Sequence, residues 1–230
     1  MKKLIPILIW LLGATVPACA QAQKVGVAPG VSVTRKTYRV PINEAPFFNF
    51  AEKNEAQNAA DQKLVADVLQ RIPDRAKATE AAILAGMRTF LQEGDIATAT
   101  KRLNQATLLD PQRSGIYHGF AMVVAARFND FDYADELFRV AALTASPAPS
   151  LRADHGRMLL IAGRPAEAKP LLEQAVRDTP DWAVPRMNLV WATLQTGSRE
   201  EACRLAAQVK GQELESVKPD LALFKQKAGC

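Results

Sequence analysis

Four alanines recur along the chain at an almost constant distance. Ala99, Ala134, Ala168 and Ala202 are separated by 35, 34 and 34 residues. Apolar residues follow each of them at the fourth and at the seventh position: Leu103, Phe138, Leu172 and Ala206, then Ala106, Ala141, Ala175 and Val209. A period near 34 residues is typical of stacked helix–turn–helix units, so this spacing constrains the fold more than any other feature.

The unit at residues 151–179 shows the pattern most clearly. Its first helix should end at Gly163, because glycine accepts the left-handed conformation that closes many helices. Pro165 suits the first turn of a second helix, and Pro180 stops that helix. Within the second helix, the spacing of four and three places small, large and small side chains on one face. A neighbouring helix can approach closely at the small residues.

The second unit is irregular. One extra residue lies between its two helices, and Phe128 stands where the other units carry glycine. We expect the turn to close through Asn129 in the left-handed region, which asparagine tolerates better than most residues.

The four units resemble the tetratricopeptide repeat family over residues 80–213. The resemblance rests on the alanine and leucine spacing, the turn glycines and prolines, and four packing residues of the first helices: Phe90, Gly156, Leu159 and Leu189. One position departs from the family, because its usual aromatic residue is replaced by Ile83, Tyr117, Arg152 and Arg186. The resemblance implies an all-α, right-handed superhelix with a concave groove that binds protein partners, and an extended N-terminal arm precedes it.

Residues 1–20 have the features of a bacterial export signal. Lys2 and Lys3 precede an apolar run, and Ala18-Cys19-Ala20 offers a cleavage site. Cys19 also fits the lipobox of bacterial lipoproteins. Two alternatives follow, a soluble periplasmic protein and a lipoprotein anchored to the membrane through Cys19. Both place the mature chain outside the cytoplasm.

The segments that flank the repeats are expected to differ in order. Residues 21–50 read as an extended arm, either a disordered linker with a reach of about 30 Å or a strand that docks on the repeats or on a partner. Residues 51–73 are predicted to form a helix that caps the first repeat, and residues 214–230 a capping helix from Pro219 with a short tail.

Composition and motifs point away from several functions. Without Lys2 and Lys3, 27 basic residues face 24 acidic ones, and the two signs are interspersed, so we expect no nucleic-acid partner. His118 and His155 lack further Cys or His ligands at metal-binding spacing. Phosphate loops, nucleophile elbows and Cys-x-x-Cys motifs are missing from the sequence as well. We therefore predict a protein that is not an enzyme and needs no metal or cofactor.

The expected function is that of a scaffold of the bacterial envelope, which binds a peptide or helix of another envelope protein in the groove. Helical register points these side chains toward the groove: Arg88, Gln92, His118, Met122, Asp154, Arg157, Met187, Asn188, Trp191 and Gln195. Two alternatives stay open. The protein could be an accessory subunit that positions an envelope enzyme, or a carrier of a small ligand or metal through His118 and His155.

Two cysteines remain in the mature chain apart from Cys19. An oxidising compartment favours a disulfide between Cys203 and Cys230, which would pin the C-terminal helix over the last repeat.

The export signal makes a prediction about the mature N-terminus. Intact-mass analysis of protein purified from its native cells should find either an acylated Cys19 or an unmodified start at Gln21 or Gln23. A retained Met1 would contradict both alternatives.

Overall fold

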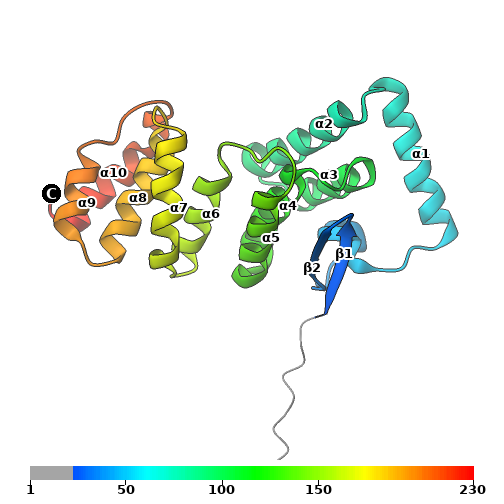
Figure 1. Cartoon of the computed structure of the whole chain (residues 1–230), viewed down its shortest axis with the longest axis horizontal. Helices are drawn as coiled ribbons and strands as arrows, with labels where there is room; N and C mark the ends of the chain where they lie inside the picture. Colours follow the sequence, from blue (N-terminus) through cyan, green and yellow to red (C-terminus); the bar gives the residue numbers. More distant parts are fainter. Residues whose placement is uncertain (1–22) are drawn as a thin grey trace, which may run out of the picture.

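The computed structural model describes residues 23–230, so the predicted export signal and Cys19 lie outside the described residues. Helices follow one another along the long axis of the molecule, from α1 at one end to α9 and α10 at the other (Figure 1). The architecture is an all-α superhelical repeat fold.

Four helix pairs form the body of the molecule. They are α2 (Arg75–Arg88) with α3 (Ile96–Leu109), α4 (Ser114–Val123) with α5 (Phe131–Leu143), α6 (Leu151–Ile161) with α7 (Pro165–Asp178), and α8 (Ala183–Gln195) with α9 (Arg199–Ala206). We call these pairs units one to four. The helices α2 and α4 continue into single π-helical turns, η3 (Thr89–Glu93) and η4 (Val124–Phe128). The unit two turn closes through Asn129 with φ 52° and ψ 26°, which confirms the left-handed conformation expected there.

Small residues let the first helices rest directly on large apolar side chains. A Cβ atom added at Gly119 would lie 2.7 Å from Cδ2 of Leu103, and one added at Gly156 would lie 2.5 Å from Cγ of Leu172. Both leucines are fully buried. Units one to three and part of unit four share one apolar cluster, and α8, α9 and α10 enclose a second one.

Residues 23–50, which we call the arm, dock on units one and two. They form a hairpin of β1 (Lys24–Ala28) and β2 (Val31–Thr34), followed by the short turns η1 (Ile42–Glu44) and η2 (Pro46–Phe50). The hairpin lies beside α3 to α5 (Figure 1). The disordered-linker alternative is therefore wrong for residues 23–50, and so is the estimate of a 30 Å tether.

Charged and aromatic side chains hold the arm in place. Glu136 of α5 accepts hydrogen bonds from the Thr34 amide at 2.6 Å and from Lys24 Nζ at 2.7 Å. The Tyr38 ring stacks on Phe128 at 3.8 Å between centroids. This contact gives a reason for the phenylalanine in the irregular turn of unit two.

The turn η2 has an unusual backbone. Phe47, Phe48, Asn49 and Phe50 all have φ between 51° and 58°, a left-handed conformation that costs roughly 1–2 kcal/mol for each residue with a Cβ. Asn104 of α3 compensates for part of that cost. It is fully buried, its Oδ1 accepts from the Phe48 amide at 3.1 Å, and its Nδ2 donates to two arm carbonyls, those of Asn43 at 3.0 Å and Ala45 at 2.8 Å.

The segment after the arm departs from the predicted cap. The helix α1 spans Glu55–Arg71, begins at residue 55 instead of 51, and is capped by Asn54, whose Oδ1 accepts from the Gln57 amide at 2.9 Å. None of its residues is buried, and its apolar side chains belong to neither apolar cluster. The helix borders unit one without covering it, because its apolar face is not turned onto the end of the stack.

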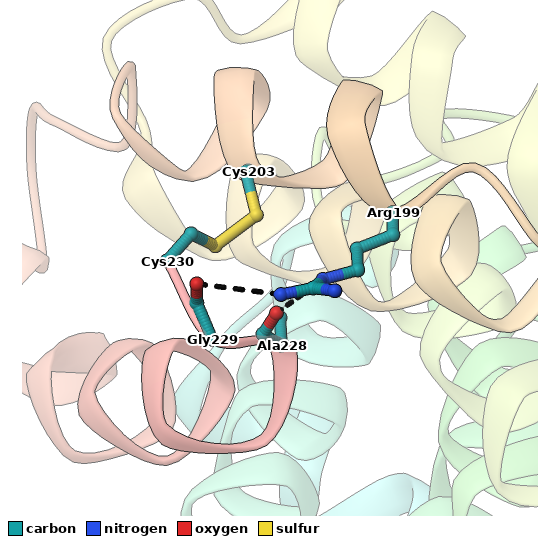
Figure 2. Close-up of a disulfide and its surroundings, with 5 residues drawn as sticks. All are labelled: Arg199, Cys203, Ala228, Gly229 and Cys230. Carbon is teal, nitrogen blue, oxygen red and sulfur yellow. Dashed lines mark hydrogen bonds between the residues drawn. A yellow bond between two sulfur atoms is a disulfide. The ribbon is translucent and has the colours of Figure 1, made fainter.

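The C-terminal cap is longer than predicted. The helix α10 spans Leu214–Ala228, so Pro219 lies inside it instead of at its start. Its buried side chains Val217, Phe224 and Ala228 pack in the second cluster. A disulfide joins Cys203 of α9 to Cys230, and Arg199 donates hydrogen bonds to the carbonyls of Ala228 and Gly229 (Figure 2).

The Asn104 contacts predict that one amide side chain governs arm docking. Asn104→Ala removes three hydrogen bonds and leaves backbone groups unpaired, so the free energy of unfolding in urea should fall by about 2–4 kcal/mol. Proteolysis should then cut the arm faster. Gln105→Ala, a neighbour whose side chain bonds only Arg102, should change stability by at most about 0.5 kcal/mol. Equal effects of both variants would reject this role for Asn104.

The disulfide makes a second prediction. It closes a sequence separation of 27 residues, for which chain entropy predicts about 3–4 kcal/mol of stabilisation. Reduction of the oxidised protein should lower its melting temperature, and Cys203→Ser should remove that sensitivity. Free thiols at both positions in natively exported protein would contradict the pairing.

Candidate partner-binding groove

A largely apolar hollow lies where units one, two and three meet, and we call it the central pocket. Its volume is about 500 Å³. Its walls come from η3, from the end of α4 with η4 and the turn after it, from α5, and from α6. The lining residues are Phe90, Leu91, Met122, Ala125, Ala126, Asn129, Phe131, Phe138, Asp154, Arg157, Met158 and Ile161.

Two π-helical turns shape this pocket. Phe90 and Leu91 lie in η3, and Ala125 and Ala126 lie in η4. Such turns are rare in proteins and frequent at functional sites, because the extra residue reorients the side chains around it. The extra residue noticed in unit two thus falls at the wall of the pocket.

A second hollow, the distal pocket, continues from the first. It measures about 290 Å³ and is lined by Arg157, Leu160, Ile161, Asn188, Trp191, Gln195 and Asp220. Arg157 and Ile161 line both pockets, so the two form one groove along the first helices of units three and four. Trp191 is half-buried and meets Phe224 of α10 edge-on at 5.6 Å between centroids.

Six of the ten predicted residues line the groove. Met122, Asp154 and Arg157 line the central pocket, and Arg157, Asn188, Trp191 and Gln195 line the distal one. Arg157 Nη1 donates to Asn188 Oδ1 at 3.3 Å and lies 3.9 Å from Asp220 Oδ2. Asn188 itself is buried, so its contribution to the groove surface is smaller than expected.

Four predicted residues lie elsewhere. Met187 is buried in the second apolar cluster, where it packs with helices α9 and α10, so its assignment to the groove is wrong. His118 is also buried, and it borders a separate pocket of about 640 Å³ between α2, α4 and residues 146–150. Arg88 and Gln92 are exposed and line neither the central nor the distal pocket.

Exposed aliphatic side chains at the groove were missed. Leu91 is 64% exposed and Ile161 is 65% exposed, and both line the central pocket. Leu84, which is 60% exposed, borders the pocket beside His118. The sequence contains a pattern that could have pointed to two of them. Leu84 and Leu91 are seven residues apart, a spacing that places two residues on one face of a helix.

Two histidine–aspartate pairs lie where unit two meets unit three. His118 Nε2 is 2.9 Å from Asp154 Oδ2, and His155 Nε2 is 2.7 Å from Asp135 Oδ1. Burial would raise the pKa of Asp135, but hydrogen bonds from His155, Arg139 and Arg164 outweigh burial and hold it below its ordinary value. Asp135 is therefore a carboxylate that can only accept, so His155 donates through Nε2–H.

Among residues 23–230, no group of three or more His, Cys, Asp or Glu side chains is placed to hold a metal ion. Over the same residues, no helix has the length and apolar character needed to cross a membrane.

No sequence model of a known protein family matches the chain, and no curated protein does. Among solved structures, the chain is similar to one from a functional characterisation of PilF of Pseudomonas aeruginosa, a protein with tetratricopeptide repeats. The match has 26% sequence identity and a TM-score of 0.58, and it covers 67% of this chain and 68% of the other. This likeness is consistent with tetratricopeptide repeats and supports a protein-interaction scaffold in general.

Proposed function

We propose that this protein is a non-enzymatic scaffold that binds a peptide or helix of a protein partner in the groove formed by the central and distal pockets. The observation that carries the proposal is the central pocket. It is concave, its walls are almost entirely apolar, and Leu91 and Ile161 stand exposed on them. Exposed apolar residues gathered in one hollow usually mark a binding surface.

The polar residues at the groove suit an interaction site. Arg157 connects the two pockets, and Trp191 supplies a partly exposed aromatic surface beside it. Arginine and tryptophan are enriched among the residues that dominate binding energy at protein interfaces. The groove therefore offers an apolar hollow for an anchoring side chain and a cation next to it.

The proposed location is the bacterial envelope, with an envelope protein as the partner. Support for this part comes from the sequence of residues 1–20 alone. The proposal covers both a soluble periplasmic form and a form anchored through Cys19.

The alternative functions have less support in the structure. A metal or ligand carrier would need accessible imidazoles, but His118 and His155 are buried and each meets a carboxylate. An accessory subunit that positions an envelope enzyme would use the same groove. Identification of the bound partner separates that case from a purely structural scaffold.

The groove proposal predicts that one exposed aliphatic residue matters and a second one does not. Ile161→Glu places a charge in both pockets and should weaken partner binding by tenfold or more, since about 1.4 kcal/mol corresponds to a factor of ten. Leu143→Glu is the matched control, because Leu143 is 88% exposed and lines none of the pockets described. It should leave binding unchanged.

The partner can be found with a photo-crosslinking amino acid placed at Leu91 or Ile161 in living cells, followed by mass spectrometry. Binding is then measured with the purified partner and both variants. The proposal is supported if both groove positions capture one protein that position 143 does not. Equal loss of binding in Ile161→Glu and Leu143→Glu, with normal circular dichroism for each, would place the binding surface elsewhere.

A further inference from the structure

The contact between units two and three is built around buried charges, whereas the contact between units one and two is apolar where Gly115 and Gly119 meet Ile83 and Leu103. We call the former contact the seam. At its centre the Phe138 ring of α5 lies between the two histidines of the protein. It stacks on His155 at 4.8 Å and 9°, and lies 5.6 Å from His118 at a tilt.

The charged groups around His155 come from every element at the seam. Its own helix, α6, contributes Asp154, which bonds His118 of α4. Helix α5 contributes Asp135 and Arg139, and Arg139 Nη2 donates to Asp135 Oδ2 at 2.9 Å.

The third side of the seam carries Arg164 and Glu167. Arg164 Nη2 donates to Asp135 Oδ2 at 2.8 Å and to Glu167 Oε2 at 2.7 Å. Asp132, almost fully exposed, lies 3.9 Å from Arg164. Two arginines thus already share Asp135, and Asp154, Glu167 and the solvated Asp132 add negative charge at the seam.

We propose that the seam is a pH-responsive joint, in which neutral His155 holds units two and three together and its protonation loosens the wall of the central pocket. The link to the pocket is direct, because Phe138 and Asp154 each contact a histidine and also line the pocket. The proposed change takes place in the wall of the pocket and can be measured without the partner.

Burial and the two neighbouring arginines favour this direction. A proton on His155 would add a third positive charge beside Arg139 and Arg164, at a residue that is only 8% exposed to solvent. Burial lowers the pKa of His155 below its ordinary value. The hydrogen bond and the charge of Asp135 oppose this shift, and the charges of Arg139 and Arg164 add smaller contributions in the lowering direction.

The sign of the pH dependence follows by linkage. Between the lowered pKa and 6.5, the unfolded chain binds more protons than the folded one, so His155 destabilises the seam as pH falls. Its stabilising effect is complete above pH 6.5 and is lost as pH falls through the folded-state pKa. Asp135 stays ionised throughout this range, because its own pKa lies below 3.8.

The experiment exploits the presence of only two histidines. Imidazole NMR signals of the oxidised protein are followed from about pH 8 to about pH 5, the range in which histidine titrates. They are assigned with His118→Gln and His155→Gln. The dye 8-anilinonaphthalene-1-sulfonate, an anion that fluoresces when it binds exposed apolar surface, reports pocket loosening in parallel. Far-UV circular dichroism checks that the helices persist.

We expect His155 to titrate below pH 6.5 and the dye signal to rise with the same midpoint. The rise should persist in His118→Gln, which removes the other buried histidine of the same seam. It should be absent in His155→Gln, whose amide can still donate to Asp135 but cannot titrate. An acid response that survives in His155→Gln, or no response in the wild type, would overturn the proposal.

A second variant keeps the test informative if His155→Gln does not fold. Arg139 is largely exposed, so Arg139→Gln should fold, and removal of its charge should move the His155 and dye midpoints to higher pH. Midpoints that stay in place would contradict the proposed role of the arginines. Loss of partner binding in the groove variants is measured separately, so the two proposals can fail independently.

Discussion

The structure depends on the contact of a glycine with a buried leucine, which occurs both between units and within a unit. At Gly119 and Gly156 there is no room for a β-carbon, so α4 lies directly against Leu103 of unit one, and α6 lies directly against Leu172 of its own unit. Protein interiors are close-packed and have low compressibility, so these contacts fix the positions of α4 and α6. The groove is formed by the opposite side of the same helices, so its shape is set by packing that no ligand touches.

The repeats could be predicted because their information is local and periodic. A spacing of four and three within a helix and of 34 between helices determines which face is buried, and the same spacing identified Arg157 and Trp191 as groove residues. The spacing was less reliable for predicting which residues of a first helix point into the groove. Met187 and Asn188 are adjacent, 100° apart on the helix, and only the second lines a pocket.

The arm could not be predicted for a different reason. Its position depends on side chains distant in sequence, such as Asn104 with the Phe48 amide and Phe128 with Tyr38. No periodic pattern reports such pairs. The left-handed turn at Phe47–Phe50 goes against the preference of those residues, and contacts such as those of the buried Asn104 amide and the packing of Phe47 and Phe50 in the core offset its cost. The buried charges of the seam were missed in the same way, because Asp135 and His155 belong to different units.

The docked arm changes what an attachment at the N-terminus would do. The Gln23 carbonyl accepts a hydrogen bond from the Arg35 amide at 2.7 Å, so the described chain is held to the hairpin from its first residue. From Cys19 to Gln23 there are four peptide steps, which span at most about 14 Å when fully extended. A lipid at Cys19 would therefore attach the folded repeats to the membrane through a short segment and would leave them little freedom to move away from it. It would hold units one and two close to the bilayer and restrict the directions in which the groove can face. Any pull on a bound partner would pass to the membrane through contacts such as the Lys24–Glu136 ion pair and the hydrogen bond from the Thr34 amide to Glu136.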